Sequence, residues 1–462
     1  MIGTRETGRA APGGETVLIH ARYLVPVRPF GQVLENHSVA LRDGVILGLA
    51  PRKEAVRAWP GATPVELNDH VLLPGLVNAH THAPMTLLRG FADDMELNVW
   101  LREHIWPAEK QFVGPEFVQD GTRLAIAEMF RSGTTCFNDM YFFPDATIAA
   151  CHAAGMRVSV GITVIEIESA WARDVDEYIE KGLALHEQHA GDPLISFTFS
   201  PHAPYTVSDR TLGRISELSE GLSVPVHMHL LETEWEIKQS FQQHELHPIS
   251  RLERQGLLNP RLLAVHMTQL SASDIDKFAE SGANVIHCPQ SNLKLASGIC
   301  PLASLLSAGI NVALGTDGAA SNNDLDMLSE AQTAALLAKG VTGDAKVVNS
   351  AEVLDMLTIN GARALGLDAR VGTIEPGKQA DLCALDLSEP ETQPLHHVVS
   401  QLIYAASRRQ FSDVWVAGRR VLNSGRLTTI DLEETTSAAR AWQDRLARLN
   451  TARPDGAKEA AS

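Results

Sequence analysis

The middle of the chain alternates between short apolar runs and segments of helix length. Near-continuous apolar runs are typical of parallel strands buried on both faces, and the segments between them can form crossover helices. Eight such units in roughly 250 residues predict an α/β protein built on a (β/α)8 TIM-type barrel. The expected barrel strands are Leu76–His80, Thr134–Asp139, Arg157–Thr163, Ile195–Ser200, Val224–Leu230, Leu262–His266, Asn284–His287 and Ile310–Asp317. The expected helices include Glu116–Arg131, Asp174–His189, Asp209–Leu222, Asp324–Lys339 and Ala351–Leu365.

Shorter β-type runs lie on both sides of this region. They are Thr16–His20, Ser38–Leu41, Val45–Leu47, Asp381–Leu385 and Val414–Gly418. Asp43-Gly44 is a hairpin turn signal between the second and third runs. We therefore expect a second, smaller β-sandwich domain from both chain ends (residues 16–73 and 367–430) beside a barrel of residues 74–366. A flexible N-terminal tail (residues 1–15) and a C-terminal helix with a flexible tail (residues 431–462, helix Leu432–Leu449) complete the expected organisation.

Charge and cysteine content exclude several classes of function. The 462 residues carry a formal net charge of -17, and an acidic surface repels phosphate backbones and anionic lipid headgroups. Nucleic acid and membranes are therefore not expected as partners, and no apolar run reaches membrane-spanning length. The five cysteines form no C-x-x-C pair, which favours buried thiols in a reducing compartment. The polar N-terminus lacks the apolar core of a signal peptide, so we expect a cytoplasmic protein.

Polar residues suited to catalysis follow most of the expected barrel strands. They are His80 with His82, Asp139, His202, His229, His266 and Asp317. Catalytic residues of such barrels lie at the carboxyl ends of the strands, so these side chains are expected to converge above the barrel. His80 and His82 are two residues apart in a strand, so both imidazoles share a face and can hold one metal ion. The alternative is a pair of structural histidines, and we interpret the deeper His227 as a core residue.

Two longer motifs flank the barrel region. They are Pro-Gly-Leu-Val-Asn-x-His-x-His at residues 74–82 and Val-Gly-Thr-Ile-Glu-Pro-Gly-Lys-Gln-Ala-Asp-Leu at residues 371–382. With the strand-end residues, they make the chain resemble the amidohydrolase superfamily over nearly its whole length. The resemblance implies one divalent metal ion, with Zn²⁺ as the first expectation and Fe²⁺ and Mn²⁺ left open. Its implied ligands are His80, His82, His229 and Asp317.

A single ion is expected because of the fourth barrel strand. Members of the superfamily that bind two ions bridge them with a carboxylated lysine at the end of this strand, and Ser196–His202 contains no lysine. Such a site leaves room for a water whose pKa the metal lowers towards neutrality. The resemblance implies that Asp317 takes the proton of this water, that His266 orients the hydroxide, and that Glu232 protonates a ring nitrogen. Attack at a C–NH₂ carbon then releases ammonia.

Further matches narrow the resemblance to the 5'-methylthioadenosine/S-adenosylhomocysteine deaminases. They lie at residues 80–90, 93–94, 100–101, 107–109, 201–205 and 315–323. By position, this resemblance implies the following contacts to an adenine nucleoside thioether. Glu109 holds the ribose hydroxyls, Trp100 packs on the substrate, His202 hydrogen-bonds the purine region, and Ser321 lines the pocket. Simple helix packing is the alternative for Trp100.

One departure concerns the homocysteine carboxylate of the larger substrate. Some relatives place an arginine after the third strand, whereas Val158–Thr163 contains none and the position of Arg173 in the following loop is open. We therefore expect methylthioadenosine as the first substrate, with S-adenosylhomocysteine and adenosine weaker or comparable.

Two other functions stay open at this point. One is a hydrolase of the same fold that acts on an s-triazine or on guanine, because fold and metal do not fix the leaving group. Glu109 favours a ribosyl substrate, since a bare heterocycle has no diol. The other is a non-catalytic scaffold, which would have no need of a complete ligand set with Glu232 and His266. The oligomeric state is also open, a homo-oligomer included.

Overall fold

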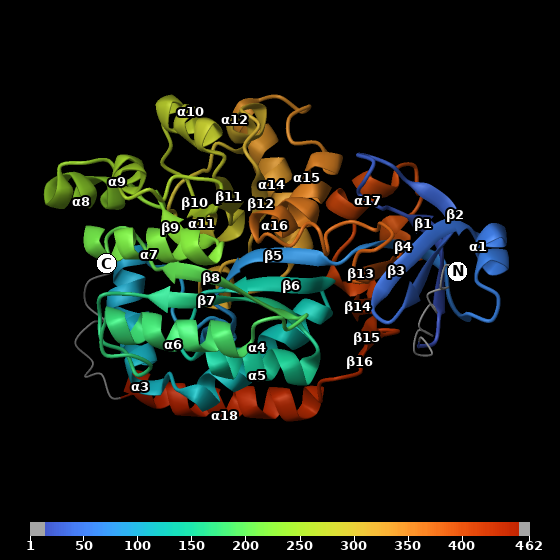
Figure 1. Ribbon diagram of the computed structural model, residues 1–462, viewed down its shortest axis with the longest axis horizontal. Coiled ribbons are helices and arrows are strands. Elements are labelled where there is room, and N and C mark those ends of the chain that lie inside the picture. The colour runs from blue at the N-terminus through green and yellow to red at the C-terminus, as the bar shows by residue number, and fades with distance from the viewer. Residues whose placement is uncertain (1–13, 452–462) are drawn as a thin grey trace, which may run out of the picture.

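The structure is a computed structural model that describes residues 14–451. Eight parallel strands form its central barrel sheet, in which each strand neighbours the next along the chain (Figure 1). They are β5 (Leu76–Thr81), β6 (Thr134–Asp139), β7 (Arg157–Val164), β8 (Ile195–Pro201), β9 (Val226–Leu230), β10 (Leu262–His266), β11 (Asn284–His287) and β12 (Val312–Leu314). The expected barrel is confirmed, although β12 is shorter than predicted.

The two ends of the barrel sheet are joined just past β12. The amide of Asp317 donates a hydrogen bond to the carbonyl of His80, at 3.0 Å. One residue earlier, the amide of Thr316 donates to Asn78 Oδ1, and Asn78 Nδ2 donates to Thr316 Oγ1. A side chain at Gly315 would lie within 3 Å of His80, so the close approach requires glycine there. These contacts bring the eighth strand against the two histidines that end the first.

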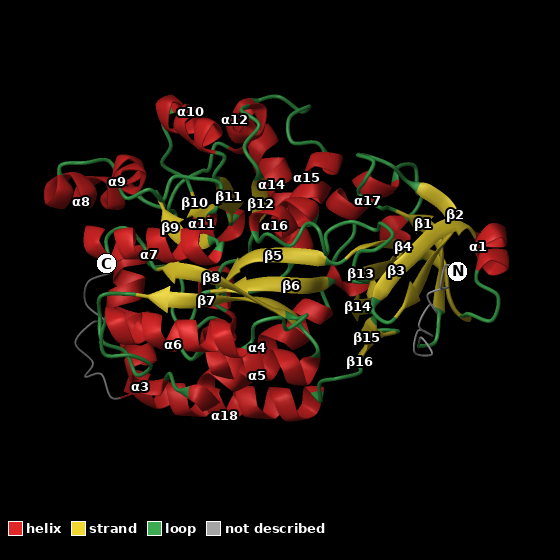
Figure 2. Ribbon diagram, in the orientation of Figure 1, coloured by secondary structure: helices red, strands yellow, loops and turns green. Residues whose placement is uncertain are grey.

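Helices cover the outside of the barrel sheet (Figure 2). They are α4 (Pro115–Phe130), α5 (Pro144–Ala154), α6 (Val175–Gln188), α7 (Asp209–Leu222), α8 (Glu234–His244), α9 (Pro248–Arg254), α10 (Ala272–Ser281), α11 (Pro289–Lys294), α12 (Leu302–Ser307), α13 (Ala319–Asn322), α14 (Met327–Thr342), α15 (Ser350–Leu357) and α16 (Ile359–Ala364). The single helix expected over residues 351–365 is divided at Thr358, which leaves helical geometry with φ −130° and ψ −92°. This bend lets Gly361 lie directly on Val77 of β5.

A second sheet is built from both ends of the chain, as the sequence predicts. Its strands are β1 (Val17–Leu24), β2 (Leu34–Arg42), β3 (Val45–Pro51), β4 (Thr63–Pro74), β13 (Leu382–Asp386), β14 (Phe411–Val416), β15 (Arg419–Asn423) and β16 (Arg426–Leu427). The N-terminal and C-terminal halves meet where β4 and β13 pair antiparallel, with Pro74 opposite Leu382. The helix α1 (Arg52–Ala58) packs on β2 and β3 of this sheet, whereas α17 (Val398–Tyr404) packs against α14 and α15 of the barrel. Residues 1–13 and 452–462 of the two expected tails lie outside the described residues.

The last helix, α18 (Leu432–Thr451), returns to the barrel and lies along α4 (Figure 1). The indole of Trp442 contacts the Phe117 ring edge-on, at a centroid distance of 5.2 Å, and donates to Asp120. The buried cluster that contains Trp442 also contains Leu97, Trp100 and Ile105. The C-terminal helix therefore supports the segment between β5 and α4, which is composed of η1 (Ala83–Leu88), α2 (Leu97–Val99), η2 (Trp100–Ile105) and α3 (Trp106–Phe112).

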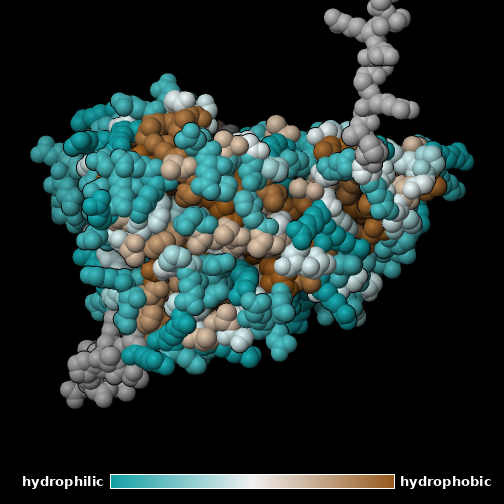
Figure 3. Space-filling model, turned by 60° about the horizontal axis from the view of Figure 1, so that its bottom comes forward, coloured by the Kyte–Doolittle hydropathy of each residue, from teal (hydrophilic) through white to brown (hydrophobic). Residues whose placement is uncertain are grey.

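None of the described helices combines the length and apolar character needed to cross a bilayer. On the face drawn in Figure 3, hydrophilic residues surround several separate hydrophobic areas.

A buried ion pair links the barrel to the second sheet. The Arg157 guanidinium at the start of β7 donates to both carboxylate oxygens of Asp381, at 2.7 and 2.9 Å, and both side chains are almost fully buried. Removal of one partner would leave the other charge buried without compensation. The pair therefore holds the two parts of the chain together at a point that tolerates little change.

We predict that Arg157→Met lowers the free energy of unfolding by about 3–5 kcal/mol, the cost of breaking a buried pair. Urea unfolding of the metal-loaded protein measures this loss. Arg22→Met is the matched control, because it breaks the half-exposed pair with Asp69 and should cost about 1 kcal/mol or less. An equal loss in the two variants would contradict the importance of the buried pair.

Candidate metal centre and active site

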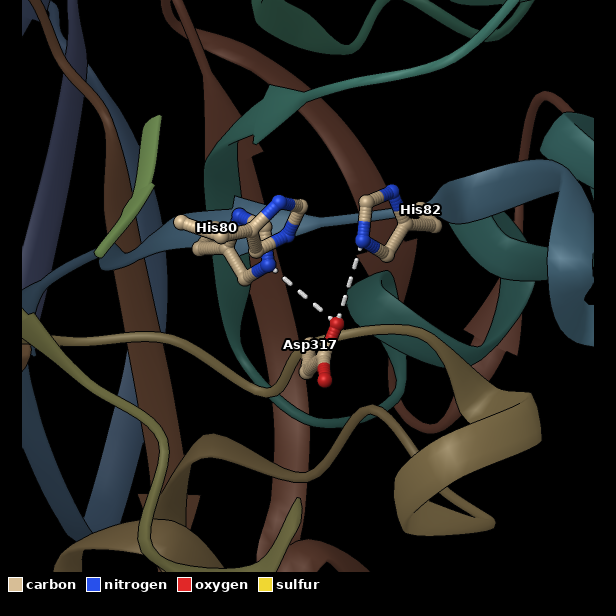
Figure 4. A group of neighbouring side chains, drawn as sticks. His80, His82 and Asp317 are labelled. Atoms are coloured by element: carbon tan, nitrogen blue, oxygen red, sulfur yellow. Dashed lines mark hydrogen bonds and ion pairs between the residues drawn. The ribbon is translucent and has the colours of Figure 1, made fainter. Parts of the chain in front are cut away.

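Four predicted ligands lie together at the carboxyl end of the barrel. His80 is the second-last residue of β5 and His82 lies just past the strand, while His229 lies on β9 and Asp317 follows β12. One donor atom from each of the four lies within 4.8 Å of the others. The Nε2 atoms of His80 and His82 each lie 3.2 Å from Asp317 Oδ1, and Figure 4 shows both imidazoles directed at this oxygen. The geometry thus forms one compact donor cluster.

Hydrogen bonds behind the cluster orient the imidazoles. His82 Nδ1 donates to the Met140 carbonyl at 2.6 Å, and His229 Nδ1 donates to the His202 carbonyl at 2.7 Å. A carbonyl can only accept, so these Nδ1 atoms carry the protons and the Nε2 atoms are left as metal ligands. His80 Nδ1 lies 2.8 Å from Nε2 of the fully buried His227, which takes the same supporting position.

The Asp317 carboxylate is fixed from several sides. Its Oδ1 accepts from the Gly318 amide at 2.8 Å, and its Oδ2 accepts from the hydroxyls of Ser291 and Ser321 at 2.6 and 2.8 Å. Ser321 was expected on the wall of the pocket, but the structure places it behind Asp317 and not among the residues that line the cavity. Its hydroxyl bonds Asp317 and the Gly318 carbonyl because α13 begins directly after the aspartate.

The electrostatics of the cluster fit a divalent cation. Burial lowers the pKa of His80 to about 4 and that of His229 well below its usual range, so both imidazoles are neutral, the form that binds metals. Burial also opposes a charge on His82, but the hydrogen bond and the negative charge of Asp317, together with the Met140 carbonyl and the charge of Asp139, outweigh it and raise the pKa of His82 to about 9. The Asp317 carboxylate therefore draws one positive charge into the cluster. A divalent metal ion would supply that charge, and three imidazoles with one carboxylate are a donor set that suits zinc.

Glu232 and His266 face each other beside the cluster. His266 Nε2 lies 3.7 Å from Glu232 Oε2, and Ser297 Oγ donates to Glu232 Oε1 at 3.0 Å. On its far side, His266 Nδ1 lies 2.8 Å from Asn292 Oδ1, which directs Nε2 towards the cavity. Burial raises the pKa of Glu232, which favours the protonated acid.

The backbone is strained at these strand ends. Leu231, His266 and Asp317 have φ values of 51°, 77° and 61°, a region that residues other than glycine rarely adopt. At the turn after β9, the Glu236 carboxylate accepts hydrogen bonds from the amides of Leu231 and Glu232, at 3.0 and 3.1 Å. The sharp turn aims the Glu232 side chain back over the barrel mouth.

A cavity of about 660 Å³ opens above the cluster. His82, His229 and Asp317 line its inner end together with Glu232 and His266, and most of its remaining wall is aromatic or aliphatic. The predicted substrate residues Trp100, Glu109 and His202 also line it. This volume and this mixture of surfaces suit a small-molecule site with a few orienting polar groups.

Three side chains on the wall, Trp100, Glu109 and His202, offer polar groups to a ligand. Among the described residues, the buried indole N–H of Trp100 has no hydrogen-bond partner. The Tyr141 hydroxyl donates to Glu109 Oε1 at 2.7 Å, and burial raises the pKa of Glu109 to about 7. His202 is neutral because burial lowers its pKa to about 3, and its Nδ1 lies 3.2 Å from Thr206 Oγ1.

Several residues of the site are not apparent from the sequence. Tyr141, two positions past the end of β6, follows the strand-end rule that identified the histidines. Ser291, Asn292 and Ser297 come from α11 and the loop after it, where no sequence pattern marks them. The open position of Arg173 is now assigned: it is exposed, pairs with Glu177 at 2.8 Å, and does not line the cavity.

Comparisons with known proteins agree over nearly the whole chain. The model of the amidohydrolase family matches residues 71–421. A curated 5-methylthioadenosine/S-adenosylhomocysteine deaminase from Teredinibacter turnerae is 49% identical over 428 residues, which covers 93% of this chain and 97% of that protein.

Solved structures give the same result. An adenosine deaminase from Xanthomonas campestris with bound zinc superposes with a TM-score of 0.93 at 52% identity and covers 95% of this chain and 100% of its own. An atrazine chlorohydrolase from Arthrobacter aurescens has a TM-score of 0.87 at 21% identity, with coverage of 92% and 99%, and this likeness shows the fold alone.

We predict about one tightly bound divalent ion per chain after removal of loosely held metal, as expected for a single four-ligand site. Elemental analysis of the dialysed protein checks this number. A reproducible value near two, with both ions required for activity, would contradict it.

His227→Ala should weaken metal binding roughly 10- to 100-fold, because it removes the support of His80. His287→Gln, a buried change on β11 outside the four-ligand group, is the control and should leave metal affinity unchanged.

Proposed function

The chain belongs to the amidohydrolase family, and on this premise we propose that it is a metal-dependent hydrolytic deaminase of 5'-methylthioadenosine and S-adenosylhomocysteine, with adenosine as a further substrate. One observation carries the proposal: a single cavity contains a metal-type cluster, a buried carboxylic acid and, along the wall, Glu109 with Trp100. The products are the corresponding inosine derivative and ammonia. The similarity to the Teredinibacter turnerae deaminase supports this substrate class.

We propose that His80, His82, His229 and Asp317 hold one Zn²⁺ ion. The hydrogen bonds from Nδ1 of His82 and His229 to carbonyl oxygens support this assignment because they leave Nε2 to face the ion, as does the bound zinc of the Xanthomonas campestris relative. When bound, the ion lowers the pKa of a water molecule towards neutrality and so makes a nucleophile available at physiological pH.

The side chains of the site then move the protons. Asp317 accepts the proton of the attacking water, and His266, held by Asn292, orients its oxygen. Water adds to the carbon that bears the amino group, while Glu232 delivers its proton to the adjacent ring nitrogen. The proton held by Asp317 passes to the amino group, and the carbon–nitrogen bond breaks to release ammonia. Glu232 regains a proton when the product takes its final tautomer.

We predict that Glu232→Gln retains metal and loses roughly two to four orders of magnitude in kcat, since the amide keeps the shape of the acid but delivers no proton. Ammonia release by the metal-replete variant measures the loss. Glu234→Gln on exposed α8 is the control and should behave as wild type. Near-normal turnover in Glu232→Gln would assign the acid to another group.

The ribose is proposed to bind between Glu109 and Trp100. Tyr141 occupies Glu109 Oε1, so Oε2 and the remaining lone pairs are available to the two ribose hydroxyls, and the unpartnered Trp100 indole N–H adds a donor nearby. Hydrogen bonds to a carboxylate are stronger than those between neutral groups. A bare heterocycle lacks the diol, so this part of the cavity favours a nucleoside over a triazine or guanine.

We predict that Glu109→Ala lowers kcat/KM for the nucleosides by roughly 1.5–3 kcal/mol, the scale of hydrogen bonds to a charged group. The slow reaction of free adenine should barely change, because adenine has no ribose. Steady-state kinetics on both substrates test this difference. Glu103→Ala, outside the cavity on the same segment, is the control. If wild type deaminates free bases as well as nucleosides, the triazine and guanine alternatives become the better proposals.

Lys110 is proposed to meet the homocysteine carboxylate. It is exposed and is the one lysine or arginine among the described residues that line the cavity, whereas Arg173 lies elsewhere. A solvent-exposed pair of this kind contributes little free energy. Methylthioadenosine, which has no carboxylate, should therefore bind without help from Lys110.

We predict that Lys110→Met lowers kcat/KM for S-adenosylhomocysteine by roughly twofold to fivefold, the range of an exposed ion pair. The substitution should leave kcat/KM for methylthioadenosine unchanged. Added salt should abolish its effect on S-adenosylhomocysteine, because salt screens an exposed ion pair. Parallel assays of both substrates at low and high ionic strength measure the effect. An equal loss on both substrates would place Lys110 in general packing instead.

We further propose a cytoplasmic location. All five cysteines are buried and free, as expected from the sequence, and this state is typical of a reducing compartment.

A further inference from the structure

A second group of metal-type ligands lies away from the cavity. His152 is on the last turn of α5, His189 ends α6, and Asp192 lies in the loop that leads into β8. These segments precede their strands, so they lie at the amino-terminal face of the barrel, opposite the candidate active site. None of the three residues lines the cavity.

The three side chains already converge. One donor atom from each lies within 4.8 Å of the others. His152 Nε2 lies 2.8 Å from Asp192 Oδ2, and the rings of His152 and His189 are 5.6 Å apart between centroids. Ligands around a zinc ion are about 3.3 Å apart, given metal–ligand bonds near 2.0 Å. Small rotations of the partly exposed imidazoles are enough to reach this spacing.

The backbone fixes the carboxylate in place. The amide of Asp192 donates to the His189 carbonyl at 3.1 Å, which closes the turn between the two ligands. Asp192 Oδ1 accepts from the Leu194 amide at 2.8 Å, so Oδ2 is directed at His152. No hydrogen bond or ion pair within residues 14–451 engages the imidazole nitrogens of His189, and they are therefore available to a ligand.

We infer that His152, His189 and Asp192 form a second metal site, which takes an exchangeable transition-type divalent cation such as Zn²⁺ or Co²⁺. Two imidazole nitrogens with one carboxylate suit these ions, whereas Mg²⁺ and Ca²⁺ prefer oxygen ligands. Three protein ligands leave positions for water, and the partial exposure makes the site weaker than the buried cluster. The net charge of -17 raises the local concentration of cations.

A cation at this site joins α5 to the loop before β8. Residues at the amino-terminal face of such barrels contribute to stability and take no part in the chemistry. The bound ion therefore raises the thermal midpoint of unfolding by mass action and leaves turnover unchanged.

The test uses the full chain with its tight site loaded and loosely held metal removed. Equilibrium dialysis against increasing Zn²⁺, followed by elemental analysis, should show one further ion per chain. His189→Gln and Asp192→Asn should each weaken this second binding step by roughly tenfold or more, the scale for loss of a ligand or its support. His186→Gln, three residues before His189 on the same helix and outside the trio, is the matched control and should bind as wild type.

A second readout separates metal binding from folding. Zn²⁺ should raise the thermal midpoint of wild type and of His186→Gln but not of His189→Gln, whose side chain has no hydrogen bond to lose. Deaminase turnover should be the same in all of these proteins, so a failure of the proposed reaction would leave this result unaffected. Saturation at one ion per chain, or a second ion that His189→Gln and Asp192→Asn bind as tightly as wild type, would overturn the inference.

Discussion

The buried carboxylate of Asp317 joins the two ends of the barrel. The backbone amide of Asp317 donates a hydrogen bond to the carbonyl of His80. The carboxylate Oδ1 lies 3.2 Å from Nε2 of both His80 and His82. A carboxylate buried this deeply is costly unless positive charge and donors surround it. The closure of the barrel between β5 and β12 therefore depends on the same charge that makes the cluster a cation site, and fold and chemistry share one group.

Hydrogen bonds from uncharged groups around the cluster also stabilise the buried carboxylate and orient the imidazoles. Ser291, Ser321 and the Gly318 amide supply donors to Asp317, while carbonyl oxygens hold His82 and His229 in one tautomer. Positive φ angles at Leu231, His266 and Asp317 occur at the three strand ends that present reacting groups. Strain of this kind persists where the surrounding structure fixes the backbone, and here the adjoining strands do so.

Sequence patterns predicted the parts of the molecule that depend on periodicity. Apolar runs of strand length located all eight barrel strands. The rule that catalytic residues lie at strand ends predicted that His80, His82, His229 and Asp317 converge above the barrel. Individual side-chain contacts were not predictable. The hydrogen bond between His266 and Asn292 joins the end of β10 to the short helix α11, and the hydroxyl of Ser321 faces the Asp317 carboxylate instead of the cavity because a short helix starts there.

Two smaller differences between the predicted and the observed elements also result from contacts between distant parts of the chain. The break at Thr358 lies within an uninterrupted helical pattern and arises from tertiary packing of Gly361 on Val77. The expected strand Ile310–Asp317 contracts to Val312–Leu314, because the residues after Leu314 leave the sheet to bond β5. Local propensity cannot report either effect, since each is decided by a partner more than two hundred residues away in the chain.

The arrangement of the cavity explains why its inner end cannot identify the substrate. In the proposed reaction, the cluster, Glu232 and His266 act on one carbon and one ring nitrogen, groups that many aminated heterocycles share. In the proposed function, selectivity comes from the segment between β5 and α4, which carries Trp100 and Glu109 and packs on the C-terminal helix through the cluster around Trp442. Because α18 lies outside the barrel sheet and its strand-end ligands, changes in this helix or in the segment it supports can alter the choice of substrate while the metal ligands stay fixed on their strands.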